Sequence, residues 1–528
     1  MKVLILTLLT CISCFILTCC SESETIDYGT DYPTIPNSGK LVKPRLTSLE
    51  FLASDNPESL IEDAVCTITG DSVADCWVSH LMDDFYNSTN SVSNRSGKQL
   101  IARFTFDGDC VRADDRKIES GITPLNFSRP RKITVIAGEM TKDYTVYVHA
   151  FTGLPVLWIE TEDRAPITSK DNYVPARFCL VEDVVTRSPG DVIETIGQIK
   201  GRGNTSWSMP KKPYRLKFSE KVSLLGEPAD KSWVLLANYS DKTMLRNATA
   251  FYMGEMSNIG YTPRSHFVEV ILNGSYDGTY QLCEKLKISK HRVNVGDDGF
   301  LMEIDEKENP EENPINFRIK HIRNPIYIKD PDVKPGDDSY NYAKDFMVTA
   351  DSVLFSANFM DPEEGWQKYI DMDSFVDWYL VNEIAKNNDA IFFSSCYMNL
   401  ARGGKVRMGP LWDFDIAFGN INYGDNFDVS GFWIRVLPWF NRLFQDPAFV
   451  ARVKEHFDYF YNHRDNIFNE INLNARYLHR SVQENENRWG ILYNTTWPNY
   501  DVWGNYQNEV QNMKGWLSRR LDWLKANL

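Results

Sequence analysis

The sequence predicts an α+β protein in which a β-rich region precedes an α-rich region, with a small β-sandwich on the N-terminal side of both. Three observations carry this prediction. Short strand patterns separated by turn signals occupy residues 44–152, longer strand patterns dominate 153–330, and helical periodicity prevails beyond residue 337. The length of 528 residues exceeds what one hydrophobic core supports, so two to three domains are expected.

The chain begins with the pattern of an export signal. Met-Lys precedes an apolar run over residues 3–18, which is shorter than the roughly 20 residues of a membrane-spanning helix. The run ends at Cys19 and Cys20 and is followed by Ser-Glu-Ser-Glu, which resembles a bacterial lipoprotein signal with Cys20 as the lipidated residue. We therefore expect a signal peptide over 1–20 and a protein anchored by lipid in the bacterial cell envelope, at the outer membrane or cell surface. Cleavage without lipid and an uncleaved anchor are the alternatives.

Residues 21–43 are rich in Ser, Glu, Asp, Pro and Gly and predict a flexible tether. The strand patterns of the next segment recur at near-regular spacing, which indicates an immunoglobulin-like β-sandwich over 44–152. The expected strands are 45–52, 65–69, 100–106, 132–137 and 144–150. Modules of this type are usually spacers or adhesive units, and no pattern in this one indicates catalysis.

The region 153–330 is expected to be rich in strands. Residues 267–274 and 278–284 alternate apolar side chains around Gly-containing turns and predict a hairpin, and one helix is expected to begin near Asp241. Beyond residue 337, apolar residues recur at three- and four-residue spacing. This spacing predicts helices over 338–358, 372–388, 446–462, 465–488 and 505–526.

Composition and charge exclude some classes of function. A net charge of −15 argues against nucleic acid as a partner, because phosphate neutralisation needs an extended basic face. The cysteines beyond the signal are scattered, so buried free thiols are favoured, with a Cys66–Cys76 bridge left open. The chain has no His-Glu-x-x-His and no Gly-x-Ser-x-Gly, so metalloprotease and serine hydrolase functions lack support.

Two carboxylates occupy an otherwise apolar, aromatic segment, Gly-Pro-Leu-Trp-Asp-Phe-Asp-Ile-Ala-Phe-Gly over 409–419. Asp413 and Asp415 need a cation or a tight hydrogen-bond network there, because an unpaired buried charge is costly. Hard oxygen ligands on a short turn suit Mg²⁺ or Mn²⁺. The alternative is a strand end whose aspartates cap a turn.

A third acid, Asp389, stands at the Asn-Asn-Asp turn that ends the expected 372–388 helix. A short strand is expected over 392–399, and Asp413 follows Asp389 by 24 residues. An acid at a helix end, followed by an acid pair at a strand end, is a layout that can hold a base near a metal. It suggests phosphoryl transfer.

A basic segment lies upstream of these acids. Its first part, Lys-Gly-Arg-Gly-Asn-Thr-Ser-Trp over 200–207, contains a Gly-x-Gly-x-x-Ser turn whose backbone N–H groups can cradle phosphate. The second part, Pro-Lys-Lys-Pro-Tyr-Arg-Leu-Lys-Phe over 210–218, adds four cations. In an acidic chain this concentration of positive charge marks an anion site. A plain hairpin with a solvated basic strand is the alternative.

Taken together, these motifs resemble the spore-coat CotH kinase family, and the resemblance is collinear from about residue 155 to 525. The segments that carry it are Ile199–Ser206, Lys211–Lys217, Trp233–Asn247, Gly278–Glu284, Gly299–Asp305, Asn387–Asp389 and Leu411–Asp415.

The resemblance implies an atypical, secreted, bilobal protein kinase-like fold over 153–528 that uses ATP and Mg²⁺ or Mn²⁺ to phosphorylate Ser or Thr in proteins. It places Asp389 at the catalytic-acid position and Asp413 at the metal, with Asp415 as a second metal or outer ligand. It also implies phosphate contacts, with Lys217 as the first candidate and Lys212 as the next. Glu284 would orient the phosphate-binding lysine or bind metal. The remaining ATP-binding residues that it implies lie in the turn: Arg202, Asn204 and Ser206.

The chain departs from ordinary protein kinases. It has no Gly-x-Gly-x-x-Gly loop, Asn-Asn-Asp takes the place of His-Arg-Asp at the turn that ends in Asp389, and Ser394 stands where an Asn is expected five residues after Asp389. A non-catalytic surface binding or scaffold lipoprotein therefore stays open, with a carbohydrate platform as one form of it. The aromatic residues for such a platform are Trp489, Tyr493, Trp497, Tyr500, Trp503 and Tyr506, which can equally pack a helical core. The sequence names no protein substrate.

Overall fold

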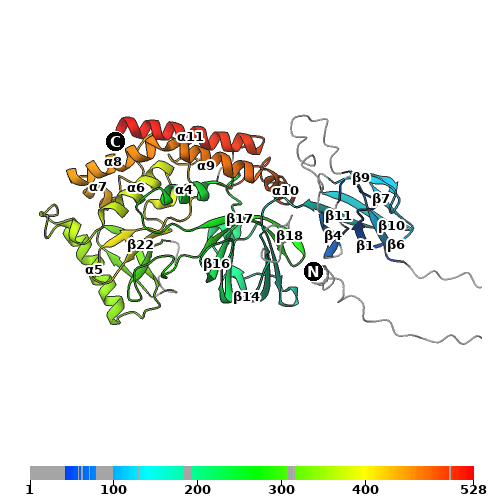
Figure 1. Cartoon of the computed structure of the whole chain (residues 1–528), viewed down its shortest axis with the longest axis horizontal. Coiled ribbons are helices and arrows are strands. Elements are labelled where there is room, and N and C mark those ends of the chain that lie inside the picture. Colours follow the sequence, from blue (N-terminus) through cyan, green and yellow to red (C-terminus); the bar gives the residue numbers. More distant parts are fainter. Residues whose placement is uncertain are drawn as a thin grey trace, which may run out of the picture. The chain divides into compact units, whose positions relative to one another are not determined.

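The computed structural model describes residues 42–57, 59–60, 63–69, 72–78, 99–127, 130–182, 192–306, 313, 315–421, 423–498 and 501–528. The export signal, Cys20 and nearly all of the tether lie outside these residues. Pro44–Leu528 forms one compact unit. It mixes helices with several sheets, which confirms the α+β class (Figure 1). In the described part of the chain, no helix combines the length and the apolar character needed to cross a membrane.

The strands before residue 151 form three sheets around a core of their own. Side chains alternate between buried and exposed along these strands, as in β10, where Ile133, Val135 and Ala137 are buried. The expected strands are found, but 65–69 and 100–106 each divide into two strands that belong to different sheets. The immunoglobulin-like type stays a prediction. Cys66 and Cys76 are buried free thiols. In sheet order the strands are β2 (Ala64–Val65), β1 (Arg45–Phe51) and β6 (Arg103–Asp107); β3 (Thr67–Thr69), β4 (Val73–Val78), β11 (Met140–Ala150), β10 (Arg131–Ala137), β7 (Cys110–Ala113) and β8 (Arg116–Ile118); and β5 (Gln99–Ile101) with β9 (Pro124–Asn126).

A closed barrel follows. Its interior is filled by apolar side chains that include Ile199, Leu216 and Trp233, which are cross-strand neighbours. Because side chains alternate along a strand, the adjacent Lys200 and Arg215, also cross-strand partners, point to the outside. The barrel order is β12 (Val156–Thr161), β13 (Val174–Val181), β14 (Val192–Gly201), β15 (Tyr214–Val222), β16 (Asp230–Leu236), β18 (Ser275–Glu284) and β17 (Ser265–Leu272).

A five-stranded sheet joins the two regions that the sequence separated near residue 330. Its order is β20 (Asn316–Ile319), β21 (Ile322–Asp330), β19 (Phe300–Ile304), β22 (Cys396–Leu400) and β23 (Val406–Met408). The strand β19 is buried along its whole length and therefore needs partners on both edges. One of them, β22, comes from the helical region.

The helices confirm the predicted periodicity with one exception. The helix expected over 465–488 is two helices that meet at the fully buried Leu478. The bend lets α10 lie on the barrel, where Asn485 accepts a hydrogen bond from the backbone N–H of Thr279 (3.2 Å). The helices are α4 (Arg246–Glu255), α5 (Asp338–Leu354), α6 (Met372–Ala385), α7 (Pro438–Leu443), α8 (Pro447–Asn462), α9 (Arg464–Tyr477), α10 (His479–Trp489) and α11 (Tyr506–Asn527), with the four-residue α3 (Thr205–Ser208).

Candidate active site

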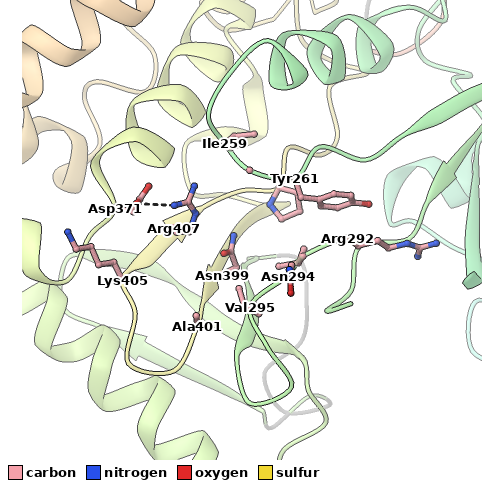
Figure 2. A pocket seen from close by; sticks show the side chains of 13 residues that line it. Ile259, Tyr261, Arg292, Asn294, Val295, Asp371, Asn399, Ala401, Lys405 and Arg407 are labelled. Carbon is pink, nitrogen blue, oxygen red and sulfur yellow. Dashed lines mark ion pairs between the residues drawn. The ribbon is translucent and has the colours of Figure 1, made fainter. Parts of the chain in front are cut away.

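A pocket of about 410 Å³ opens between the loops that flank the β17–β18 hairpin and the β22–β23 hairpin (Figure 2). Its lining is mixed: Asn294 and Asn399 supply amides, and Arg407 is ion-paired with Asp371 at 2.9 Å. Pro410 also lines it and precedes Asp413 by three residues. The pocket therefore adjoins the chain segment that leads to the predicted acids.

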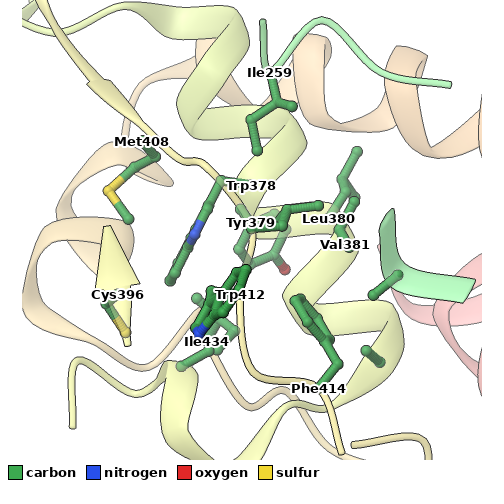
Figure 3. Close-up of a cluster of buried hydrophobic side chains, with 14 of the residues drawn as sticks. Ile259, Trp378, Tyr379, Leu380, Val381, Cys396, Met408, Trp412, Phe414 and Ile434 are labelled. Carbon is green, nitrogen blue, oxygen red and sulfur yellow. The ribbon is translucent and has the colours of Figure 1, made fainter. Parts of the chain in front are cut away.

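The acid turn is held by aromatic packing and by one amide. Asp413 has a positive φ of 66° between Trp412 and Phe414, whose side chains are buried in the cluster of Figure 3. The backbone N–H of Phe414 donates to Oδ1 of Asn247, a residue of α4, at 2.8 Å. The anchored neighbours hold the backbone of Asp413 in a conformation that few residues adopt, a feature that clusters at functional sites.

Asp389 lies on the neighbouring turn. Helix α6 ends at Lys386, which has left-handed backbone angles and donates to three backbone carbonyls of the 425–430 loop. Asn387 then donates to the backbone carbonyl of Asp413 at 3.3 Å. Asp389 follows in a short 3-10 turn and is 5% exposed. The two acid-bearing turns are thus bonded directly to each other.

The carboxylates form one cluster. Burial, together with the negative charges of Asp413, Asp389 and Asp241, raises the pKa of Asp415 well above its usual range, and Asp415 is also hydrogen-bonded to Asp413. Ser395 Oγ donates to Asp413 Oδ2 at 3.1 Å. The structure therefore brings the three predicted acids together and adds Asp241, which the sequence analysis did not single out.

The donor chemistry of this cluster fits a divalent cation. The carboxylates are hard oxygen donors, and their mutual repulsion is what bound positive charge relieves. Asp241 is already ion-paired with the buried Arg246, which leaves Asp413 and Asp415 as the candidate ligands. Among the described residues no group of three or more His, Cys, Asp or Glu is arranged to hold a metal by itself. Mg²⁺ usually takes one or two carboxylates plus phosphate oxygens, so a complete protein cage is not required.

Two cations, Arg202 and Lys285, directly follow the barrel strands β14 and β18. The guanidinium of Arg202 lies 5.4 Å from the ring centre of Trp412, next to Asp413, and its charge also acts on Tyr397 of β22. Burial is the larger cause, and the positive charge of Arg215 the next, of a pKa of Lys285 that is lowered to about 8. Among the residues that the structure describes, no carboxylate lies within ion-pair distance of Arg202 or Lys285.

Other predicted phosphate contacts have partners elsewhere. The Lys212 ammonium donates to the carbonyl of Trp207 at 2.8 Å, and the buried Lys211 donates to Asn485 at 2.8 Å. Glu284 does not orient a lysine of the basic segment. Its carboxylate accepts a hydrogen bond from Arg264 at 2.7 Å and another from the Tyr261 hydroxyl at 2.9 Å. The ion pair with Arg264 satisfies a carboxylate that is completely buried.

Two N–H groups of the Gly-x-Gly-x-x-Ser turn are already used by the fold, and a role of the turn as a phosphate cradle stays a prediction. The N–H groups of Gly201 and Arg202 already donate to Ser169 and Pro213 carbonyls at 2.9 and 3.1 Å. Asn204 is exposed before the four-residue α3, and Ser206 lies so close to Gly203 that a Cβ there would meet its Oγ at 2.2 Å. Lys217 is exposed and lies 5.9 Å from the Tyr173 ring centre.

Sequence reasoning missed Lys285, Ser395 and Asp241. Lys285 directly follows Glu284, and Asp241 belongs to the Trp233–Asn247 segment, so both lay within or beside segments already recognised. Ser394 was placed at the position of the missing Asn, whereas it is Ser395 that contacts Asp413. The difference arises because Ser395 adopts a positive φ of 57° at the start of β22, which a residue count does not reveal.

Comparison with known families shows to which family the chain belongs. A family model described as CotH kinase protein matches residues 199–524, more than half of the chain. The chain belongs to the CotH kinase family. The family suggested by the motifs is thereby confirmed, and the CotH match covers Arg202, Lys285 and all four acids of the cluster. A comparison of the sequence with curated proteins gives no match.

Proposed function

We propose that this CotH-family protein is a surface-anchored, atypical protein kinase that transfers the γ-phosphate of ATP to Ser or Thr of extracytoplasmic proteins. One observation carries the proposal. The carboxylates of Asp389, Asp413 and Asp415 act on one another, and Arg202, directly after barrel strand β14, lies beside Trp412 of the same turn. Lys285, directly after β18, is a second cation with no carboxylate in ion-pair distance among the described residues. Opposed charges of this kind suit phosphoryl transfer, where catalysis is mostly positioning and charge stabilisation.

Each residue has its own role in the proposed reaction. Asp389 accepts the proton of the substrate hydroxyl as its oxygen forms a bond to the γ-phosphorus and the bond to the β,γ-bridging oxygen breaks. Arg202 and Lys285 neutralise the phosphate oxygens. Asp413 and Asp415 would hold Mg²⁺ or Mn²⁺, which when bound offsets phosphate charge. In this proposal the barrel and the helical region are the two lobes.

The rival function, a non-catalytic scaffold, would be favoured by acids that point into separate cores. The electrostatic coupling of Asp415 to Asp413 and Asp389 argues for the kinase instead. The proposed carbohydrate platform has little support in the described residues, because Trp489 donates to Asp277 at 2.8 Å and the Tyr506 hydroxyl to Thr243 at 3.1 Å. Tyr493 and Trp503 remain exposed.

The direct test is incubation of the chain from residue 21 onward with γ-labelled ATP and Mn²⁺ or Mg²⁺. We expect label on the protein itself and on added acceptor proteins, with Asp389→Asn as the matched inactive control. Label that appears equally with Asp389→Asn would contradict the assignment.

Lys285 should control nucleotide affinity in a pH-dependent way. With a pKa of about 8 its ammonium is charged below that pH and neutral above it. The ATP affinity of the wild type should therefore fall as the pH rises from 7 to 9. Lys285→Gln should bind ATP weakly at every pH. Lys285→Arg, which keeps its charge, should show a flat profile in calorimetric titrations. A wild-type profile as flat as that of Lys285→Arg would remove Lys285 from the phosphate site.

The lipid anchor is a separate proposal, because Cys20 lies outside the described residues. We expect the mature chain to begin at Cys20, to carry a diacyl or triacyl group and to partition with membranes. Intact-mass analysis of the N-terminal peptide checks this, and Cys20→Ser should release the protein. An unmodified N-terminus recovered from the soluble fraction of the wild type would reject the anchor.

A further inference from the structure

A group of cations surrounds Tyr173, just before β13, on the outer face of the barrel. Lys200 Nζ lies 4.8 Å from the centre of the Tyr173 ring, Lys217 Nζ 5.9 Å and the guanidinium carbon of Arg215 6.0 Å. The strands β14 and β15 supply all three, and Lys200 is the cross-strand partner of Arg215. These four residues are here called the Tyr173 cluster.

The charge of this cluster is not compensated. Among the described residues no carboxylate lies within ion-pair distance of its three cations. Burial and the positive charges of Arg215 and Lys217 lower the pKa of Lys200, while Asp171 only partly opposes them. Like charges held together without a counter-ion destabilise the free protein, so the arrangement favours an anionic ligand.

Two buried donors of the cluster are also unsatisfied. The Tyr173 hydroxyl and Nε of Arg215 are both buried and have no hydrogen-bond partner among the residues that the structure describes. Buried polar groups of folded proteins are nearly always hydrogen-bonded, and an orphan donor is a cost that a bound acceptor removes. Lys200, Lys217 and Arg215 have long side chains that can move aside for a ligand.

The outer end of the cluster lies beyond the nucleotide phosphates. Lys217 pairs with Gln198, four residues before Arg202. At about 3.3 Å per residue this places Lys217 roughly 13 Å along the sheet from Arg202, farther than one triphosphate group extends. Lys200 is two residues from Arg202 and the charge of Arg215 acts on Lys285, so the inner end adjoins the phosphate contacts. Lys217 is exposed, so the outer end is open to a second anion that approaches from solvent.

We propose that the Tyr173 cluster binds acidic side chains of the protein substrate, so that the phosphorylated Ser or Thr lies within an acidic segment. The inference rests on the proposed kinase function, because it places the substrate next to the transfer site. A chain with a net charge of −15 repels acidic partners overall, and a local basic patch is what gives such a partner a defined register.

The test is peptide binding without nucleotide. A fluorescein-labelled peptide with a central Ser flanked by Glu is compared, by fluorescence anisotropy, with the same peptide carrying Gln in place of Glu. The wild type should bind the Glu peptide at least tenfold more tightly. Lys200→Gln combined with Lys217→Gln should lose about tenfold of that affinity. Lys344→Gln combined with Lys454→Gln removes two exposed lysines from α5 and α8 and should leave the affinity unchanged.

Calorimetry with ATP on the same proteins separates this inference from the kinase itself. Unchanged ATP affinity in Lys200→Gln/Lys217→Gln supports a separate substrate site. Weaker ATP binding with unchanged peptide binding would overturn it, as would equal wild-type affinity for the Glu and Gln peptides. A wild type that binds the Glu peptide but no ATP would reject the kinase function while the acid-binding cluster stands.

Discussion

Asp413→Asn is expected to abolish metal-dependent ATP binding, whereas Asp389→Asn should leave binding nearly intact and lower turnover on the order of 10²- to 10³-fold. The difference follows from position. Asp413 shares its site with Asp415, where negative charge is needed to hold the cation. Asp389 acts on the substrate hydroxyl, which matters only after nucleotide is bound. Calorimetry with ATP and Mn²⁺, together with the rate of label transfer, measures both effects.

A structural control is available beside the acid turn. Ser395→Ala removes the hydroxyl that donates to Asp413 Oδ2 but leaves every carboxylate in place. It should therefore retain metal-dependent ATP binding better than Asp413→Asn. Equal ATP affinity in the wild type, Asp389→Asn and Asp413→Asn would favour the scaffold function. The absence of ATP binding by the wild type would do the same.

Arg520→Met is expected to destabilise the helical region by about 3–5 kcal/mol, because it leaves a buried carboxylate unpaired. Arg520 and Glu383 are both fully buried and lie 2.8 Å apart. Glu383 also accepts the backbone N–H groups of residues 433–435, and the indole of Trp433 donates to the carbonyl of Asn387, two residues before Asp389. The ion pair therefore supports the loop that carries the proposed base.

Thermal unfolding checks this expectation. A loss of that size should lower the melting temperature by roughly 10 °C. Arg519→Met, on the exposed neighbour, is the matched control and should change stability by less than about 0.5 kcal/mol. The double variant with Glu383→Gln should lose less than the sum of the single losses, because no charge is then left unpaired. Equal losses for Arg519→Met and Arg520→Met would show that the ion pair contributes nothing.

Local patterns were sufficient for much of the fold and for half of the site. Five strand segments of the first region, the helices α5, α6, α8 and α11 and the acids Asp389, Asp413 and Asp415 were predictable, whereas β4, β7, β8 and β9 were not expected. Periodicity and turn chemistry depend on neighbouring residues, so they survive in any tertiary context. The family itself was recognisable because its motifs lie in a fixed order along the chain.

The partners of the charged side chains were decided only by the tertiary structure. In sequence, Lys212, Lys217 and Glu284 look like any charged residues in or beside a strand. In the structure Lys212 binds Trp207, Lys217 lies near Tyr173 and Glu284 binds Arg264. The same holds for Lys285, whose lowered pKa needs burial and cations from other strands. The sequence by itself determined where acids, cations and regular elements occur. The packing of distant strands determined which of them meet, because burial and ion-pair energies depend on long-range contacts that no local pattern contains.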